Sequence, residues 1–419
     1  MTVTRQPFSV ALFGLLQAIS VVGMVPGIPK LVRGVALMVF GWVSYILITQ
    51  TTTGDLPIDV AIGSAILTQY MITIDVLLLT QPNVLRNPQD PLSNKVTKRT
   101  LRQRITWAFH LYTNPRGIGW SHEHPHLPNR PSLSTPRWTF VRTRIFRAFF
   151  CICLERVGYF LNASNPGTTT PGRILSESPF HWRAVGVTGF AAAGFARINM
   201  LNCLLSAAIV GLGISSPERW PNLFGSPLDA WSVQRFWRRV WHQLLRKSLV
   251  ACTSVFTSSI TLHNSSRILK KLIRLHVAFM IIGVIHLGGE YMIIDEIIWS
   301  GAFKFFTLQA VAITLESVLS HLWSISSRSQ KLPKATKDLH PNGNTNGHSG
   351  LAKKANPSSI APQRRLSLAL RLLGCTWVSL WFIWSAAFMI DPMVSSGMFV
   401  DPQADLRQRI GMFKWPWGS

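Results

Sequence analysis

Residues Leu272–Ile294 read LIRLHVAFMIIGVIHLGGEYMII, and this stretch decides the class of fold. A run of about 20 apolar residues is long enough to cross the hydrocarbon core of a bilayer as an α-helix. His286 and Glu290 nevertheless lie well inside the run. Because an ionisable group at that depth is costly, its presence indicates a functional residue with a partner. The stretch therefore predicts a membrane-spanning helix that carries a functional histidine.

Similar apolar segments lie on both sides of this stretch, and only 14% of the chain is charged, against about 25% in soluble domains. The backbone must satisfy its own hydrogen bonds in lipid, which favours helices. We therefore predict an all-α protein, a polytopic transmembrane helical bundle of seven to nine spans. The other expected spans are Phe8–Ile28, Leu31–Gln50, Ile58–Thr80, Val185–Gly213, Leu249–Leu262, Ala302–Trp323 and Leu368–Ile390, with the charge-interrupted Phe140–Leu161 as a weaker candidate.

The net charge of +25 is concentrated in two loops. Arg86–Arg147 carries 12 basic and 2 acidic residues, and Ser327–Arg371 carries 9 basic residues and 1 acidic residue. Lys and Arg collect in cytoplasmic loops, so we expect both loops in the cytosol and the N-terminus on the opposite side of the membrane. We expect this membrane to be the endoplasmic reticulum. No recognised nucleic-acid-binding motif accompanies the charge, so a nucleic-acid partner is not expected.

Composition also divides the chain. Residues 1–326 are expected to form the first part of the transmembrane domain, and residues 368–419 the last transmembrane helix and a tail. Between them, residues 327–367 are rich in Lys, Ser, Pro, Asn and Gly, which predicts a disordered basic cytosolic linker. Asn162 and Asn264 match the glycosylation pattern, and the sequence leaves their use open.

We expect no bound metal. The five cysteines lie in apolar segments and include no CxxC pair, which indicates neither a zinc site nor a disulfide framework. Three histidines stand close together in SHEHPH (Ser121–His126), but the prolines and charges around them favour a solvated loop.

The segment Ser232–Lys247, SVQRFWRRVWHQLLRK, has an apolar stripe at helical spacing if it is taken as one helix. The other face then holds Arg235, Arg238, Arg239, His242 and Arg246. This pattern is typical of a basic amphipathic helix at a membrane surface, which is a purely structural interpretation. A functional one is compatible with it: nearby cations would keep the imidazole neutral, and arginines suit phosphate groups.

In the embedded stretch, Glu290 follows His286 by one helical turn. A carboxylate there would orient the imidazole, as a general base requires. Gly283, Gly288 and Gly289 would allow another helix to approach closely. Two alternatives stay open: a structural His–Glu pair between helices, and a proton relay in a transporter. We find no internal repeat of the kind that supports a transporter.

Four motifs, taken together, resemble those of a known family. They are NPRGIGW (Asn114–Trp120), SVQRFWRRVWHQLLR (Ser232–Arg246), FMIIGVIHLGGE (Phe279–Glu290) and FFTLQAVAITLE (Phe305–Glu316). Between about residues 114 and 316 the chain resembles the wax synthase-like branch of the membrane-bound O-acyltransferase superfamily. The resemblance is to its fungal secondary-metabolite O-acetyltransferases, of meroterpenoid and trichothecene-type pathways. The family's usual Ser-Gly pair before the membrane histidine is Ile282-Gly283 here.

The resemblance implies acyl transfer from acyl-CoA to a hydroxyl group. His286 matches the membrane-embedded histidine, which is expected to act as general base. His242 matches the polar residue after the paired aromatics. Together with Gln243, it is expected to position the thioester or to donate a hydrogen bond to the oxyanion. The remaining expected site residues are Glu290 and Trp241 as supporting groups, and Arg238, Arg239 and Arg246 as acyl-CoA-binding groups.

The expected partners are acyl-CoA as cosubstrate, a hydrophobic alcohol and membrane lipid, with no bound cofactor. From the resemblance we favour acetyl-CoA and a terpenoid-like or polyketide-like acceptor. A long-chain wax ester synthase is the alternative enzyme, and a catalytically silent scaffold that binds anionic lipid is the alternative of another class. The acceptor, the hydroxyl that is modified, the acyl chain length and the oligomeric state stay open.

Overall fold

A computed structural model describes residues 5–80, 85–86, 100–123, 127–128, 130–259, 266–294, 300–329 and 368–400. Four expectations fall wholly or largely outside these ranges: the histidines at 124 and 126, the sequon at Asn264, the linker at 327–367 and the tail after residue 400. They stay predictions, as do the domain boundaries and the cytosolic placement of the two basic loops.

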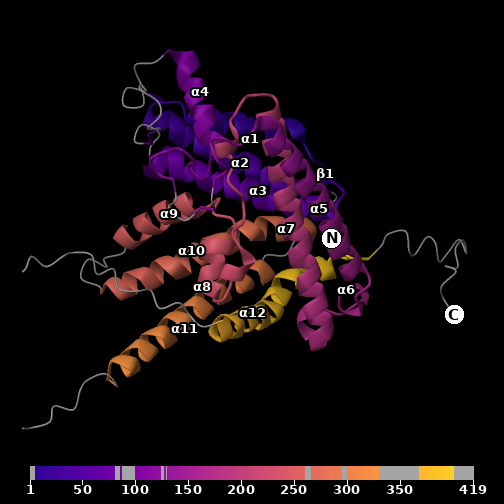
Figure 1. Ribbon diagram of the computed structural model, residues 1–419. Helices are drawn as coiled ribbons and strands as arrows, with labels where there is room; N and C mark the ends of the chain where they lie inside the picture. The colour runs from indigo at the N-terminus through magenta and orange to yellow at the C-terminus, as the bar shows by residue number, and fades with distance from the viewer. Residues whose placement is uncertain are drawn as a thin grey trace, which may run out of the picture.

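The described chain is almost entirely helical (Figure 1), which confirms the all-α fold class. The longer helices are α1 (Val10–Gly23), α2 (Lys30–Gln50), α3 (Leu56–Ile74), α4 (Leu101–Tyr112), α5 (Arg137–Ala163), α7 (Phe180–Gly211), α9 (Arg246–Ser259), α10 (Arg267–Ile294), α11 (Gly301–Ser329) and α12 (Leu368–Ser395). The short elements are η1 (Asp75–Thr80), α6 (Pro166–Thr169), η4 (Leu175–Glu177), η5 (Pro217–Arg219), η6 (Pro227–Asp229), α8 (Val233–Arg235) and η7 (Phe236–Val240), with a two-residue parallel pairing of β1 (Gln6–Pro7) and β2 (Thr51–Thr52).

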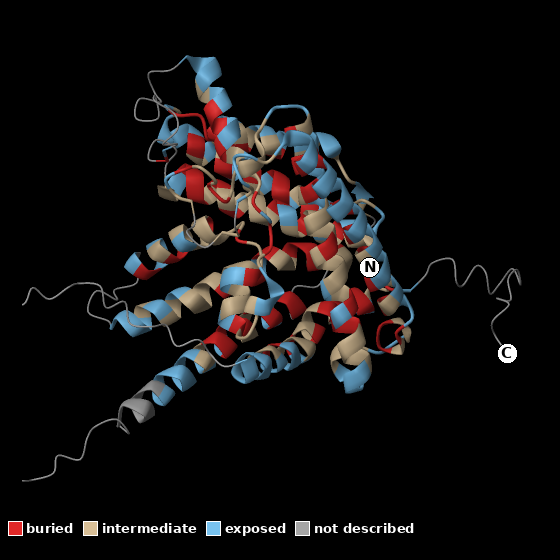
Figure 2. Ribbon diagram, viewed as in Figure 1, coloured by how far each residue is buried: buried red, intermediate tan, exposed pale blue. Residues whose placement is uncertain are grey.

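Among the described residues, six helices are long and apolar enough to cross a membrane: α2, α3 with η1, α7, α10, α11 and α12. The expected number was seven to nine. The difference lies in α1 and α9, which have only 14 residues each, and in α5, whose 27 residues include several charges. Helix α5 still exposes large apolar side chains, among them Phe146, Phe149 and Phe160. Figure 2 shows such exposed residues along the outer faces and buried ones where helices meet.

Helix α10 lies at the centre of the bundle, where it packs against α3, α9, α11 and α12. The approach to α3 is made through glycines. A Cβ atom on Gly63 of α3 would collide with the carbonyl group of Gly288, and a Cβ on Gly289 would collide with the Val60 carbonyl and the Ser64 hydroxyl. The glycines that suggested a close helix approach therefore do allow one, and they fix the height of His286 in the bundle.

Helices α11 and α12 return alongside α10 and complete this part of the bundle. Buried polar contacts set their register. The Gln309 amide of α11 donates to Ser385 of α12 at 3.1 Å and accepts from the Trp381 indole at 3.1 Å. A Cβ on Gly301 would meet the Phe388 carbonyl, so the start of α11 touches α12 through backbone. These contacts orient the α11 aromatic residues toward α10.

Candidate active site

The segment Ser232–Lys247 is not one helix, and the expectation of a single amphipathic helix is wrong. Ser232 caps α8 by accepting a hydrogen bond from the Arg235 backbone, and α8 passes directly into the π-helical turn η7. That turn ends at Val240; Trp241 is extended, with ψ 149°, and α9 begins only at Arg246. The apolar periodicity therefore stops describing the structure at the residue that precedes His242.

Two hydrogen-bonding groups hold the chain where it leaves the helix. The Gln243 side-chain amide donates to the carbonyls of Trp237 at 2.9 Å and Trp241 at 2.8 Å, replacing donors that a continued helix would have supplied. The Gly225 backbone N–H donates to the Val240 carbonyl at 2.9 Å. Because both amide hydrogens of Gln243 are used on the backbone, its contacts do not match the expected role as an oxyanion donor.

Glu290 does not orient His286. Its carboxylate accepts from the Ser300 hydroxyl and, at 2.5 Å, from the Ala302 backbone N–H at the start of α11. Helix N-termini present N–H groups without intrahelical partners, so a buried carboxylate is a fitting cap there. Within the described residues His286 makes no hydrogen bond. The expected His286–Glu290 pair is therefore wrong, and Glu290 instead fixes α11 against α10.

Glu316, the last residue of the FFTLQAVAITLE motif, caps a second helix. It accepts from the backbone of Val233 at 2.7 Å and of Gln234 at 3.0 Å, and from the Trp377 indole at 3.0 Å. The N-terminus of α8 is thereby tied to α11 and α12. Both acidic residues that end the two α10–α11 motifs thus position helices around the site.

A chain of aromatic contacts links the two predicted histidines. The His286 ring stacks on Phe306, with centroids 4.8 Å apart and planes at 15°. Phe306 also contacts Trp237, at 5.7 Å, and Trp237 contacts Trp241, the neighbour of His242, at 5.9 Å. His286 is near enough to His242 to disfavour a positive charge on it. We call Trp237, Phe279, Phe305, Phe306 and Phe382 the aromatic wall.

His242 is held as a neutral imidazole. Burial, then the neighbouring His286 and Arg116, lower its pKa to about 4. At neutral pH the ring is therefore uncharged, as expected, although the cation responsible is Arg116 and not an arginine of its own segment. Its Nδ1 is buried and has no hydrogen-bond partner within the described residues. Phe224 lies against the ring, at 5.8 Å.

Arg116, within NPRGIGW, is a site-building residue that the sequence did not reveal. It is 7% exposed, and its guanidinium donates to the carbonyls of Asn222 at 2.9 Å and Pro221 at 3.2 Å. Burial and the charge of Arg144 lower the pKa of Arg116 to about 10, so it stays cationic at neutral pH. Because Pro221 and Asn222 lead directly to Phe224, Arg116 holds the connection that packs on His242.

The NPRGIGW turn is shaped to present this arginine. The Asn114 side chain donates to the Ile118 carbonyl at 2.8 Å and accepts from the Ile118 N–H at 3.0 Å, which closes the turn. Gly117 and Gly119 have φ angles of 64° and 78°, a left-handed conformation that favours glycine. The backbone conformation of the turn thus accounts for the glycines of the motif, and the hydrogen bonds of Arg116 account for the arginine.

The other end of the His242 turn is anchored by a buried ion pair. Lys247 donates to the Asp75 carboxylate at 2.6 Å, and the Ser248 hydroxyl donates to it at 2.8 Å. Asp75 is fully buried and stands at the first position of the π-helical turn η1. The turn that carries His242 is therefore fixed to α3 after it and to Arg116 through the connection before it.

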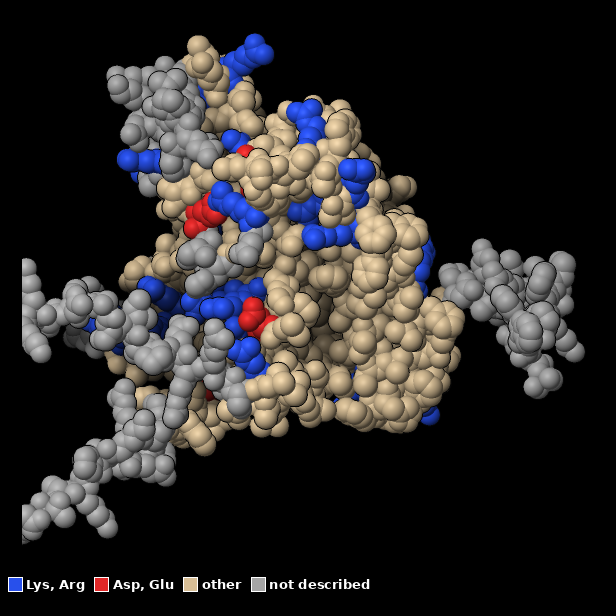
Figure 3. Space-filling model, in the orientation of Figure 1, with Lys and Arg blue, Asp and Glu red and all other residues tan. Residues whose placement is uncertain are grey.

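The predicted phosphate-binding arginines separate into two places. Arg238 and Arg239 line a pocket of about 270 Å³ together with Arg235 and Glu316. Figure 3 shows basic side chains gathered over α8 on this face. Arg246 instead donates to the Gln243 side chain at 3.2 Å and supports the turn. We call the 270 Å³ cavity the arginine pocket.

Comparison with known proteins shows what this part of the chain is similar to. Residues 220–308, which include both histidines, match the Membrane bound O-acyl transferase family. The chain is 29% identical over 385 residues to acetyltransferase eriL of Hericium erinaceus, covering 89% of this chain and 88% of that protein. It is 27% identical over 312 residues to acetyltransferase ple2 of Rhodocybe pseudopiperita, covering 68% and 81%. It is 31% identical over 240 residues to O-Mevalon transferase macI of Penicillium terrestre, covering 52% and 54%.

The segment that carries both histidines is therefore similar to the membrane-bound O-acyltransferase family. The matched residues contain α8, η7, the His242 turn and all of α10, whereas Arg116 and Asp75 lie outside them. Arg116 and Asp75 thus support the site from parts of the chain that the family match does not cover. Gln243 and Glu290 support it from within the match.

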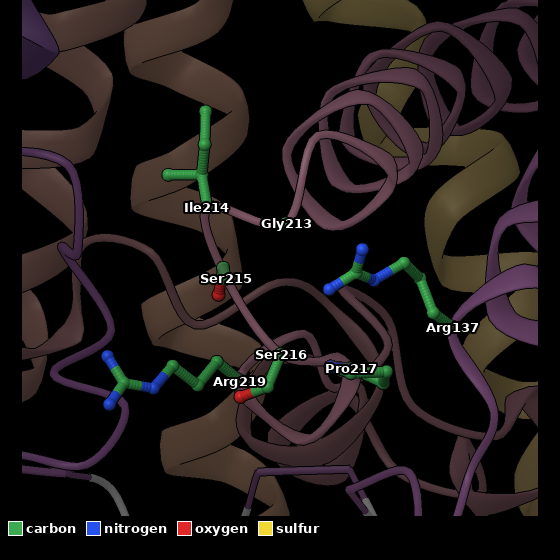
Figure 4. A pocket seen from close by; sticks show the side chains of 7 residues that line it. All are labelled: Arg137, Gly213, Ile214, Ser215, Ser216, Pro217 and Arg219. Carbon is green, nitrogen blue, oxygen red and sulfur yellow. The ribbon is translucent and has the colours of Figure 1, made fainter.

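A second pocket contains none of the predicted site residues. It has a volume of about 440 Å³ and lies between the start of α5 and the connection that follows α7 (Figure 4). Arg137 points over that connection, whereas the Arg219 guanidinium points away from it. Within the described ranges, no group of three or more His, Cys, Asp or Glu side chains is arranged to hold a metal ion.

Proposed function

We propose that this membrane acyltransferase moves an acetyl group from acetyl-CoA to a hydroxyl group of a hydrophobic, terpenoid-type metabolite, with His286 as the general base. One observation carries the proposal. His286, inside the apolar bundle and free of hydrogen bonds to the described residues, stacks on the aromatic wall, which ring contacts link to a second, neutral imidazole at His242. We further propose that the membrane is the endoplasmic reticulum.

The reaction balances without a covalent enzyme intermediate, because a thioester is already activated. The acceptor hydroxyl oxygen attacks the thioester carbonyl carbon, so a C–O bond forms and the C–S bond breaks. His286 takes the hydroxyl proton, and the departing sulfur of coenzyme A receives it. General-base catalysis of this kind contributes about 10²–10⁴-fold to the rate.

His242 suits the acyl end of the donor. A ring that stays neutral because its pKa is about 4 offers a hydrogen-bonding nitrogen without adding a charge that would repel a protonated His286. The buried, unpartnered Nδ1 marks a hydrogen-bonding capacity that a bound substrate would use. We propose that His242 positions the thioester.

The arginine pocket suits the coenzyme A end. Guanidinium groups bind phosphate oxygens through paired N–H donors, and Arg238 and Arg239 are exposed where they line the pocket. Its volume of about 270 Å³ accommodates a phosphate group and its immediate neighbours. Arg235 also lines the pocket, where it is ion-paired with Asp229 at 2.8 Å. Arg246 leaves the proposed set because it does not line the pocket and donates to Gln243 instead.

The aromatic wall suits an apolar acceptor. Its five side chains offer mainly ring surface next to His286, so a hydroxyl on a hydrocarbon skeleton would be presented to the base while the skeleton stays in apolar surroundings. The names of two of the relatives support acetyl as the group transferred, and the name of the third indicates that transferred groups differ among them.

The test uses the full-length protein in microsomes, with labelled acetyl-CoA and palmitoyl-CoA in competition, and with farnesol and hexadecanol as acceptors. We expect acetyl transfer to farnesol to dominate, and His286→Ala to lower it by about 10²-fold or more. The control is His276→Ala on the same helix, because His276 only bonds the Leu272 carbonyl, at 2.9 Å. Preferred palmitoyl transfer to hexadecanol would make the protein a wax ester synthase, and a His286→Ala rate within about threefold of the parent would remove the base.

A further inference from the structure

One buried hydrogen-bond donor near His286 has no partner. The Nε1–H group of Trp237 is inaccessible and makes no hydrogen bond within the described residues. Buried indole N–H groups usually find an acceptor, because leaving one unpaired costs free energy. By contrast, the Trp377 and Trp381 indoles of α12 donate to Glu316 and Gln309.

The surroundings of Trp237 explain why the chain supplies no acceptor. Its ring contacts Phe279 and Phe306, each at 5.7 Å, Phe382 at 6.1 Å and Phe305 at 6.3 Å. Phenyl rings carry no hydrogen-bond acceptor atom, and a buried water molecule needs two or more polar partners that they do not provide. An unpaired donor in such a place indicates that the missing acceptor comes from a ligand.

The position of the ring tells which ligand. Phe306 contacts both Trp237 and His286, so the indole and the proposed base share one neighbouring ring. On the other side Trp237 contacts Trp241, which adjoins the unpartnered Nδ1 of His242. The indole therefore contacts both the ring that stacks on the proposed base and the neighbour of the group that would position the thioester.

We propose that Trp237 is a further catalytic residue, whose Nε1–H donates a hydrogen bond to the carbonyl oxygen of the bound thioester. The inference rests on the proposed function. As the acceptor hydroxyl adds, that oxygen gains negative charge, so the hydrogen bond strengthens in the transition state and lowers the barrier. The indole keeps its proton throughout, and the bonds that form and break are those of acyl transfer.

The donor role falls to Trp237 because the amide of the same segment is occupied. Both hydrogens of Gln243 are bonded to backbone, one of them to the carbonyl of Trp237 itself at 2.9 Å. That bond also fixes the backbone from which the indole projects. Gln243 is thus a positioning residue, and Trp237 is the group of this segment that would touch the thioester.

A binding experiment with two coenzyme A analogues isolates this hydrogen bond. S-acetonyl-CoA carries a ketone oxygen in the group attached to sulfur, in place of the thioester carbonyl, whereas the ethyl group of S-ethyl-CoA carries no carbonyl. Trp237→Phe removes the N–H group and keeps an apolar ring. We expect it to weaken binding of the ketone analogue about 3–10-fold and to leave the affinity for the thioether analogue unchanged. We expect kcat for acetyl transfer to fall about 10²-fold.

The matched control is Trp384→Phe, on the neighbouring helix α12 and 42% exposed, which should change neither affinity nor kcat. Continued binding of S-ethyl-CoA shows that Trp237→Phe is folded. If it does not fold, 3-benzothienylalanine at position 237 retains the bicyclic shape without the N–H. Equal effects on both analogues, or no effect on either, would overturn the role of Trp237. Failure of the parent protein to bind either analogue would instead overturn the acyl-CoA proposal itself.

Discussion

The two histidines of the site are held in place by different means. His286 projects from a regular helix, α10, whose position is set by glycine contacts with α3 and by the capping of α11 through Glu290. His242 projects from an irregular turn, which is held by side-chain bonds to backbone and by buried charges. A helix that packs through glycines tolerates substitutions that leave small residues at the helix contact. A turn of this kind depends on each of its few polar contacts. Substitutions away from the rings should therefore affect the two histidines differently.

The largest effect is expected at the buried ion pair that anchors the His242 turn. Lys247→Met leaves the Asp75 carboxylate buried without its cation, which typically costs about 3–5 kcal/mol. We expect a clearly lower melting temperature in detergent, measured by size-exclusion chromatography after heating, and a loss of acyl transfer.

The double variant Asp75→Asn with Lys247→Met removes the charge together with its partner. It should recover much of the stability, because an uncharged amide is cheaper to bury than an unpaired carboxylate. A double variant as unstable as Lys247→Met would show that the pair does not account for the anchoring of the turn.

An intermediate effect is expected on the side of His286. Gly63→Ala places a methyl group against the Gly288 carbonyl, and overpacking of this kind costs about 1–3 kcal/mol. The matched control is Gly34→Ala, a helical glycine whose added Cβ would have open space around it. Equal melting temperatures for the two variants would contradict a backbone contact between α3 and α10.

The smallest effect on stability, and the most specific one on chemistry, is expected at Arg116. Arg116→Lys keeps the charge but not the paired N–H donors on Pro221 and Asn222, whereas Arg116→Gln removes the charge. We expect each to lower kcat/KM by about 10-fold, which corresponds to the loss of about one buried hydrogen bond to a charged donor. Arg102→Lys, exposed on α4, is the control.

The two Arg116 variants should differ in their dependence on pH. Because a nearby cation disfavours the imidazolium, removing it raises the pKa of His242 from about 4 toward the ordinary value of 6.5. In Arg116→Gln the ring should therefore gain its proton, and lose its reactivity with diethyl pyrocarbonate, at a higher pH than in the parent or in Arg116→Lys. Labelling is followed at the peptide that contains His242. Coincident labelling curves would contradict the proposed effect of the Arg116 charge on the pKa of His242.

The sequence predicted the α10 half of the site well because one physical requirement dominates there. An apolar run of about 20 residues has few alternatives to a membrane helix, and the glycines around His286 have a direct use in packing. The predicted role of Glu290 was wrong because the partners of its carboxylate lie outside this apolar run. The spacing from His286 was helical, but the partners of the carboxylate come from the next helix.

The His242 half was predicted less well because its structure depends on distant partners. The apolar stripe suited a helix, but Gly225 and Gln243 hold the chain in another conformation. Arg116 was missed since the carbonyls that it binds lie more than 100 positions away in sequence. The pattern of a segment shows which face is apolar, and it does not show which remote backbone will compete for its hydrogen bonds.

The departure of the chain from helical geometry just before His242 has an evolutionary consequence. On a helix, the direction of a side chain is tied to every neighbouring turn, so the base on α10 changes only with the whole bundle. After the break at Trp241, the ring direction depends on how the Pro221–Gly225 connection lies against it. Insertions or deletions in that short connection would reshape the space offered to the donor while leaving proton transfer intact. Divergence of donor preference within one scaffold would then require no redesign of the catalytic base.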